Sequence, residues 1–408
     1  MKTRLHRIAP LLLLTTLVTS PVRCQNWPQW LGPDRDGRAP GFTAPAEWPA
    51  ELKKAWQVTV GQADATPALM NGKLYVFARQ EGDEVTLALD AATGKELWRD
   101  AYAAEGATGP ASRHAGPRSS PVVMDGKVIT FGVRGTLSCL DATSGKVLWR
   151  KNDFPDAFPR FFTSASPVVA NGLVIAQVGG GDKGGIAAYD LGSGDRKWLC
   201  DCGEPAYASP TLATLGGMTL VVALTGSEIV VVDLAGGAVR WRMAFTPQRR
   251  AYNAATPIVD GATVYVSGAG RGTKAIGLSV SGTEVTGKEL WANADVAVQF
   301  STPLLKDGLL YGLTDRGSFF CLNAENGQTL WTDPDRRGNG YGCLVDGGKV
   351  LLATSPDSEL IVLAPGGDKY TVLAKYKVAE GPVYAFPVPS GNHLYIQDNS
   401  SLTLWAAE

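Results

Sequence analysis

The sequence predicts an all-β fold, an eight-bladed β-propeller with four antiparallel strands per blade, and two periodic features predict it. A turn motif, LDAATGKELWR at 89–99, returns as LDATSGKVLWR at 140–150 and in weaker form at 189–198, 232–241 and 322–331. Seven tryptophans also recur at spacings of 40 to 51 residues. They are Trp56, Trp98, Trp149, Trp198, Trp241, Trp291 and Trp331. Four short strands in roughly 40–50 residues are typical of one propeller blade.

Each repeat opens with a small residue followed by proline, and a hairpin comes next. The segments MNGKLYVFA at 70–78 and MDGKVITFG at 124–132 show the hairpin clearly. Asn-Gly and Asp-Gly favour a tight turn because both turn residues need a positive φ. The openings are Thr66-Pro67, Ser120-Pro121, Ser166-Pro167, Ser209-Pro210, Thr256-Pro257 and Thr302-Pro303.

The two ends of the repeat region predict how the ring closes. A seventh unit starts near 340 without the proline, and an eighth opens at Phe386-Pro387 but contains only three strands before the end at 401–408. The segment LKKAWQVTV at 52–60 carries a Trp strand with no strands before it. We expect this segment to complete the eighth blade, since pairing the two ends removes an open sheet edge.

The turn motif itself is interpreted as scaffold. In the first copy, Asp90 can accept hydrogen bonds from the turn backbone, and Gly94 supplies a positive φ. Trp98 then starts the outer strand. A tryptophan there fills the wedge between neighbouring blades and buries roughly 150–250 Å². The tryptophans are therefore predicted to dock one blade on the next.

The first 51 residues divide into two segments. Residues 1–24 resemble a secretory signal peptide, because basic residues precede the apolar run IAPLLLLTTLV at 8–18. The alternative is a lipid anchor on Cys24, but Val22-Arg23 is a poor match to the small residues that such processing needs. Export to the periplasm or cell envelope is expected in both cases.

Residues 25–51 are predicted to be an N-terminal clasp segment on the propeller of residues 52–408. Trp27, Trp30 and Trp48 are large apolar side chains in a segment that has no strand pattern of its own. Such side chains need a surface to cover them, and the propeller supplies it.

Composition excludes several classes of partner. The net charge of −1 argues against nucleic acid, and no run of 18 apolar residues predicts a transmembrane helix. We expect a monomer. After the leader the chain has only His114 and His393, so we expect no histidine-rich metal site, and no Cys-x-x-Cys-His haem motif is present.

The D-A-x-T-G-K-x-L-W turn, together with the small-proline hairpin, resembles the PQQ-like (pyrroloquinoline quinone) repeat. The resemblance covers essentially all of 52–408 and is strongest in the first two units. The lead-in NWPQWLGPDRDGRAP at 26–40 is similar to that of planctomycete-type exported members. The family implies an eight-bladed fold shared by quinoprotein alcohol dehydrogenases and by non-enzymatic BamB-type proteins.

The resemblance also implies what a catalytic member holds. In the enzymes, PQQ is held by a disulfide of adjacent cysteines and a stacking Trp, beside a Ca²⁺ or lanthanide bound by Glu, Asn and Asp. Here Cys200 and Cys202 are the nearest match but are not adjacent, and their oxidation state stays open. We therefore expect an exported, non-catalytic binding scaffold without cofactor or metal. The alternatives are a PQQ- and calcium-dependent dehydrogenase with an unusual site, and a surface module that binds carbohydrate or protein.

The mouth of the central channel is the predicted binding site. The first strand of a blade is innermost, so the residues just before each small-proline step ring one opening. Aromatic groups interleaved with Arg, Asn and Gln suit a planar or carboxylate-bearing ligand, or a peptide of an envelope or outer-membrane protein; the alternative is a rim without a ligand. The predicted residues are Asp64, Arg118, Arg160, Tyr207, Tyr252, Asn253, Gln299, Phe300, Tyr341 and Tyr384.

Overall fold

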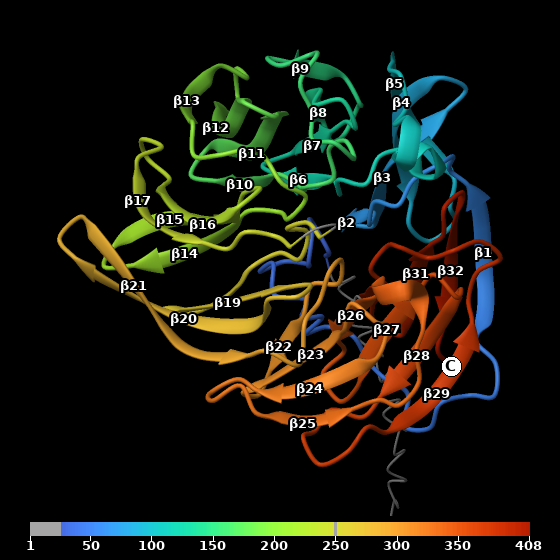
Figure 1. Cartoon of the computed structure of the whole chain (residues 1–408). Helices are drawn as coiled ribbons and strands as arrows, with labels where there is room; N and C mark the ends of the chain where they lie inside the picture. The colour runs from blue at the N-terminus through green and yellow to red at the C-terminus, as the bar shows by residue number, and fades with distance from the viewer. Residues whose placement is uncertain (1–25, 249–250) are drawn as a thin grey trace, which may run out of the picture.

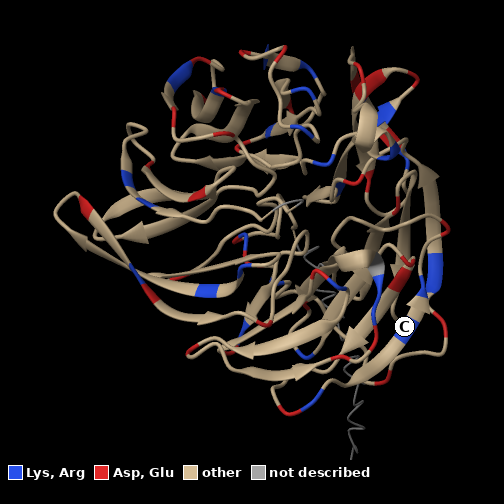
Figure 2. Ribbon diagram, in the orientation of Figure 1, with Lys and Arg blue, Asp and Glu red and all other residues tan. Residues whose placement is uncertain are grey.

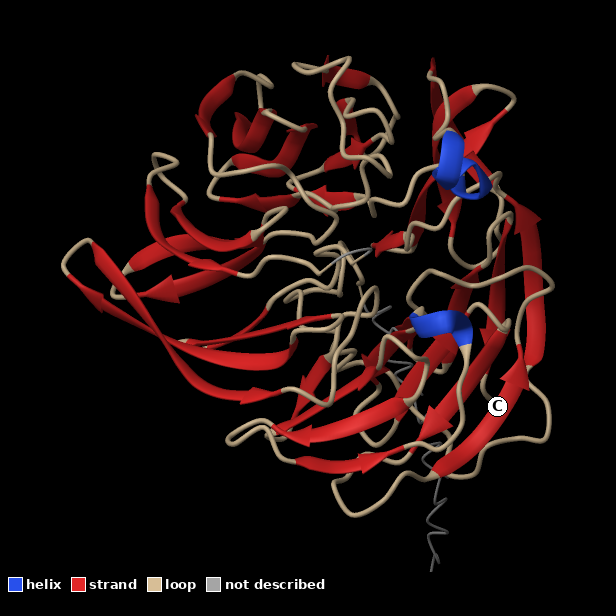
Figure 3. Ribbon diagram, in the orientation of Figure 1, coloured by secondary structure: helices blue, strands red, loops and turns tan. Residues whose placement is uncertain are grey.

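The computed structural model describes residues 26–248 and 251–408, and these form a ring of eight four-stranded antiparallel sheets around a central channel (Figures 1 and 3). The predicted fold class is confirmed. The signal-peptide prediction and the alternative at Cys24 lie outside the described residues. Lys, Arg, Asp and Glu are interspersed around the ring (Figure 2).

The first four blades each consist of four consecutive strands, running outward from the channel. Blades 1 and 2 are β2(Ala68–Met70), β3(Lys73–Gln80), β4(Asp83–Asp90), β5(Glu96–Ala103), β6(Val122–Met124), β7(Lys127–Phe131), β8(Leu137–Asp141) and β9(Val147–Lys151). Blades 3 and 4 are β10(Val168–Ala170), β11(Leu173–Gly180), β12(Lys183–Asp190), β13(Arg196–Cys200), β14(Thr211–Leu215), β15(Met218–Leu224), β16(Glu228–Asp233) and β17(Val239–Ala244). A 3₁₀ turn, η1(Gly109–His114), lies between blades 1 and 2.

The remaining blades follow the same order up to the closure. Blades 5 and 6 are β18(Ile258–Asp260), β19(Thr263–Gly268), β20(Gly272–Ser281), β21(Glu284–Asn293), β22(Leu304–Lys306), β23(Leu309–Leu313), β24(Phe319–Asn323) and β25(Thr329–Thr332). After η2(Gly338–Gly340), blades 7 and 8 are β26(Cys343–Asp346), β27(Leu351–Ser355), β28(Glu359–Leu363), β29(Val372–Lys377), β30(Val388–Ser390), β31(His393–Gln397) and β32(Ser401–Ala406). The fourth strand of blade 8 is β1(Lys53–Thr59).

The ring closes between the two ends of the described chain, as predicted. Strand β1 pairs antiparallel with β32, with Trp56 opposite Leu404 and Val58 opposite Leu402. Each blade is thereby a complete sheet whose first strand faces the channel. In blade 8 the outermost strand is β1, and its inner edge is hydrogen-bonded to β32.

Tryptophans dock seven of the eight blades, blade 8 and blades 1 to 6, each on the next blade. The Trp149 indole of blade 2 donates its Nε1–H to the Leu191 carbonyl of blade 3 at 3.1 Å and packs on Gly194. A Cβ at Gly194 would lie 2.6 Å from that ring, so a side chain there would clash. The repeated turn motif therefore provides the surface on which the indole of the preceding blade packs. The other indoles packed this way are Trp56, Trp98, Trp198 and Trp291, on Gly94, Gly145, Gly237 and Gly327.

The small-proline steps form a second ring of contacts around the channel. The Ser120 amide donates to Ser166 Oγ at 2.9 Å, and the Ser166 amide donates to Ser209 Oγ at 2.9 Å. Each hydroxyl thus satisfies a buried amide of the neighbouring blade. The other links join Phe386 to Thr66, Thr66 to Ser120, Ser209 to Thr256, and Thr256 to Thr302. This is the physical reason why the residue before proline is Ser or Thr in blades 1 to 6.

The N-terminal segment, drawn dark blue near the centre of Figure 1, packs on the end of the channel that carries the first hairpin of each blade. Trp27 forms an isolated bridge with Leu69, and Phe42 forms one with Gly391. The Trp27 side chain is fully buried in the largest hydrophobic cluster. The segment therefore spans blades 1 and 8 at this end.

Candidate functional site

A cavity of about 370 Å³ lies at the other end of the channel, the mouth formed by the chain leading into the first strands. This volume is within the range of small-molecule pockets. Its lining residues come from all eight blades and from the N-terminal segment. They are Trp30, Asp64, Pro110, Ala111, Arg113, His114, Arg118, Phe161, Ser164, Tyr207, Ser209, Tyr252, Ala254, Thr256, Phe300, Tyr341 and Tyr384.

Aromatic rings occupy the arc of the cavity formed by blades 3 to 8. Phe161 and Tyr252 meet edge to face with ring centroids 4.8 Å apart. Phe300 and Tyr341 stack in parallel at 4.0 Å, and Tyr341 meets Tyr384 edge to face at 5.4 Å. Such contacts hold the rings in fixed orientations. Burial raises the pKa of Tyr341 to about 12, so its hydroxyl stays protonated and able to donate.

Charged groups occupy the remaining arc, which is formed by blades 1 and 2. The Arg118 guanidinium donates from Nη2 to the Phe161 carbonyl at 2.5 Å. Its other two nitrogens have no hydrogen-bond partner among the described residues, and Nε is buried. Burial lowers the pKa of Arg118, and the nearby Asp64 carboxylate opposes that effect. An arginine remains charged under such a shift.

The Asp64 carboxylate already contacts a histidine. Its Oδ2 lies 2.6 Å from His114 Nδ1, and the His114 ring meets Tyr384 edge to face at 4.9 Å. His114 ends η1, which places Arg113 at the same rim. The single carboxylate among the described lining residues is thus paired, while two arginines line the same cavity. The cavity carries a net positive charge.

Trp30 lines the cavity on the side of the N-terminal segment. Its Nε1 donates to Thr256 Oγ1 at 3.2 Å, and its ring meets Phe386 edge to face at 4.8 Å. Deeper in the channel, Arg35 donates to the Pro210 carbonyl at 2.8 Å and to the Pro167 carbonyl at 3.2 Å. Burial lowers the pKa of Arg35 to about 9. The clasp segment therefore fills the channel below the cavity.

The structure brings seven of the ten predicted site residues into this one cavity. The other three lie elsewhere. Asn253 is buried and donates to the Thr225 and Phe245 carbonyls, so its amide ties blade 4 to blade 5. Gln299 is also buried outside the cavity, and Arg160 is exposed beside the Phe161 ring. Asn253 and Gln299 each precede a lining residue, and side chains alternate in direction in an extended chain.

Sequence reasoning missed two lining residues that matter for charge and shape, and a partly buried arginine below them. Trp30 was predicted to belong to the clasp segment but not to the cavity. Arg113, which directly precedes His114, was not predicted as a site residue. Arg35 was not predicted to lie in the channel. The unpatterned aromatics of the lead-in were the signal for Trp30, but its partner Thr256 is 226 positions away. No periodicity could have joined them.

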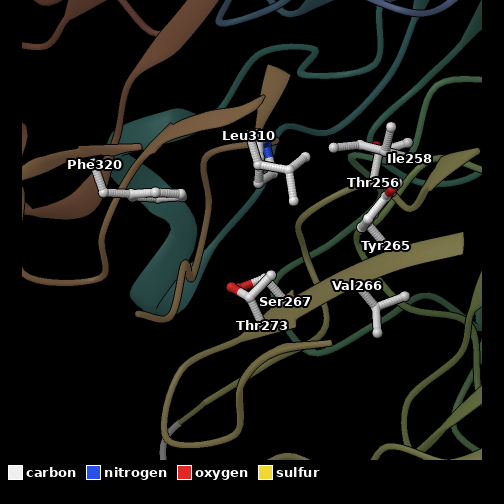
Figure 4. Close-up of a pocket in the computed structure, with 9 residues that line it drawn as sticks. Thr256, Ile258, Tyr265, Val266, Ser267, Thr273, Leu310 and Phe320 are labelled. Atoms are coloured by element: carbon white, nitrogen blue, oxygen red, sulfur yellow. The ribbon is translucent and has the colours of Figure 1, made fainter. Parts of the chain in front are cut away.

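A second cavity, between blades 5 and 6, is far smaller (Figure 4). Its volume is about 10 Å³, which is near the minimum for a single water molecule. The polar groups beside it are already bonded to protein, since Ser267 Oγ and Thr273 Oγ1 lie 2.8 Å apart and Thr273 donates to the Val296 carbonyl. This cavity is too small for a ligand, so the mouth cavity is the candidate site.

Comparison with known proteins identifies the family. A family model described as "Outer membrane protein assembly factor BamB" matches residues 82–333, more than half of the chain. The chain belongs to the PQQ-like repeat β-propeller family. Its relatives include BamB proteins and quinoprotein alcohol dehydrogenases, as the turn motif suggested.

Both kinds of relative appear among the curated proteins. BamB of Yersinia pestis is 24% identical over 323 residues, which cover 77% of this chain and 68% of that protein. Quinohemoprotein alcohol dehydrogenase of Comamonas testosteroni is 30% identical over 154 residues, which cover 36% of this chain and 21% of the enzyme. The chain thus matches only about a fifth of the length of that dehydrogenase.

Solved structures show the same fold. BamB from Moraxella catarrhalis superimposes with a TM-score of 0.64 at 18% identity, covering 88% of this chain and 98% of that one. The Comamonas testosteroni dehydrogenase superimposes with a TM-score of 0.68 at 16% identity, covering 94% and 80%. At these identities the likeness extends to the fold alone.

The residues of the mouth cavity do not fit a calcium-bound quinone. A hard cation needs six to eight oxygen ligands, and Asp64, the one lining carboxylate in the described chain, is paired with His114. Within residues 26–248 and 251–408, no three His, Cys, Asp or Glu side chains form a metal-binding group, and all five cysteines are free. Across those same residues, no helix is long and apolar enough to cross a membrane.

Proposed function

We propose that this protein is an exported, non-catalytic binding scaffold of the cell envelope that holds a segment of an envelope protein in its mouth cavity. The observation that carries the proposal is the cavity itself: aromatic side chains from six blades converge there with two arginines of the connection between blades 1 and 2. Rigid aromatic rings and arginine are the side chains that dominate protein-binding surfaces.

Two further features support this role. BamB, with which the chain shares a family, is named as an assembly factor for outer-membrane proteins. The first 24 residues have the order of charged, apolar and small residues that directs export. Fold-level analogy alone is weak evidence for function, so the test must address the cavity.

The test compares two variants of the tagged full-length chain expressed in its native host. Tyr252→Ala with Phe300→Ala removes two rings of the cavity, whereas Val372→Ser with Leu373→Ser changes exposed side chains of the outer strand β29. After mild cross-linking and purification from the envelope fraction, we expect wild type and the β29 variant to retain the same envelope protein. The cavity variant should lose it.

Three results would contradict the proposal. The first is absence of the protein from the envelope fraction, and the second is loss of the partner by the β29 variant alone. The third is reduction of a dye with alcohols by purified protein given PQQ and Ca²⁺. Thermal unfolding of both variants controls for misfolding.

A further inference from the structure

We propose that the mouth cavity binds a carboxylate carried next to an aromatic ring, with the carboxylate on Arg118 and the ring against the aromatic arc. This inference rests on the proposed function, because it names the chemistry of the group that the same cavity holds. The ligand is an end group, either a free aromatic acid or the aromatic C-terminal residue of a polypeptide.

The charged arc requires an anion. Arg118 uses one nitrogen on the Phe161 carbonyl and has two nitrogens without a partner in the described chain. A buried donor without a partner costs free energy, and a ligand oxygen would satisfy it. Asp64 bonds His114 at 2.6 Å, and among the described residues no hydrogen bond or ion pair joins it to Arg118. A planar guanidinium matches the two oxygens of a carboxylate.

The aromatic arc requires a flat apolar group beside the anion. Blades 5 and 6 lie across the ring from blades 1 and 2, so Tyr252 and Phe300 stand opposite Arg118. Their positions are set by ring contacts, with Tyr252 against Phe161 and Phe300 stacked on Tyr341. A ligand ring packed there would gain edge or face contacts of the usual strength.

The closed lower side requires an end group. Trp30 lines the cavity below, and the clasp segment fills the channel beyond it, with Arg35 bonded to the Pro167 and Pro210 carbonyls. A polypeptide cannot thread through the ring. A volume of about 370 Å³ admits one terminal residue with its carboxylate, or a small free acid.

The experiment measures binding to the purified full-length protein by calorimetry. One pair of probes is 3-phenylpropanoate and its uncharged amide; the other is a short peptide ending in phenylalanine, with a free or an amidated C-terminus. Each is tested on wild type, on Arg118→Met and on Arg160→Met. Arg160 is the matched control, because it is an exposed arginine at the same mouth that does not line the cavity.

We expect at least one acid to bind and its amide to bind roughly tenfold or more weakly, since a charge-assisted hydrogen bond is lost. Arg118→Met should show a similar loss and Arg160→Met none. Which acid binds, the free one or the peptide, identifies the source. Equal binding of acid and amide, unchanged binding by folded Arg118→Met, or no binding of either acid would overturn the inference.

Two safeguards keep the result interpretable. If Arg118→Met does not fold, the preference of wild type for acid over amide still decides. Envelope capture that persists in Arg118→Met would overturn the carboxylate chemistry but leave the proposed function intact. If the acid binds but no envelope protein is captured, the carboxylate chemistry stands and the proposed function is overturned.

Discussion

Blades 1 to 6 and the junction of blades 7 and 8 close the ring by different means. In blades 1 to 6, an indole docks on the next blade and a hydroxyl accepts the amide of the preceding blade. In blade 7, Ala374 takes the register position that Trp98 has in blade 1, since each pairs just before a bulge in the outer strand. By the same register, Cys343 in blade 7 and Phe386 in blade 8 stand where blades 1 to 6 have Ser or Thr. The docking indole and the hydroxyl acceptor are therefore both missing at the junction of blades 7 and 8.

Other parts of the chain replace them at that junction. Trp405 of β32 belongs to the same cluster as Ala374 and donates its Nε1–H to the Val378 carbonyl at 3.1 Å. Trp48 packs on Tyr376, whose hydroxyl donates to the Pro49 carbonyl at 2.7 Å. The difference shows that closure needs a large side chain at every junction, but not from the same strand.

The largest expected effect is in the regular part. Trp149→Ala should lower the free energy of unfolding by about 3–5 kcal/mol, because it leaves a cavity between blades 2 and 3. Urea unfolding measures it. Leu148→Ala is the control, since Leu148 is 43% exposed beside it and should cost little. A loss for Trp149→Ala no greater than that of the control would contradict indole docking.

A smaller and local effect is expected at the junction. Trp48→Ala should lower the free energy of unfolding by about 2 kcal/mol, as a half-buried ring is removed. Hydrogen exchange should rise in β29 and stay unchanged in β9. Glu47→Ala, an exposed neighbour, should change neither. Uniform loss of protection around the ring would mean that Trp48 is not a local replacement.

The hydroxyl ring predicts a still smaller effect. Ser166→Ala should lower the free energy of unfolding by about 1–2 kcal/mol, because the buried Ser120 amide loses its acceptor. Ser166→Thr should retain most of the stability, since threonine fills this position in blades 1, 5 and 6. If alanine and threonine behaved alike, the hydroxyl would have no role in closure.

The smallest effect is one of pH. Glu84, buried between blades 1 and 2, accepts from the Val133 amide at 2.8 Å and from the Tyr102 hydroxyl. Burial raises its pKa above the ordinary 4.5, so its stabilising contribution is full below 4.5 and falls as pH rises through the folded-state pKa. Glu84→Gln cannot ionise and should therefore gain stability relative to wild type as pH rises above 4.5. Urea midpoints of both proteins at several pH values measure the difference, and Glu47→Gln is the control; a constant difference would contradict it.

The features that recur from blade to blade could be predicted from the sequence. Contacts that occur only once in the molecule could not. Blade number, closure through β1 and the Trp positions follow from a motif that meets the same physical need at each junction. Residues three places before each proline reached the cavity, as with Tyr207 and Phe300. Asn253 and Gln299, one place earlier, did not, because side-chain direction alternates. Trp30 and Trp48 could not be placed, since their partners lie far away in sequence.

The most direct test of the account is photo-cross-linking from the mouth cavity. A benzoylphenylalanine at position 252 is compared with one at position 372 on the exposed edge of blade 7, in tagged protein within the native envelope. The account predicts one cross-linked envelope protein at 252, joined through its C-terminal residues or displaced by an aromatic acid, and none at 372. Cross-links at 372 and none at 252 would contradict it.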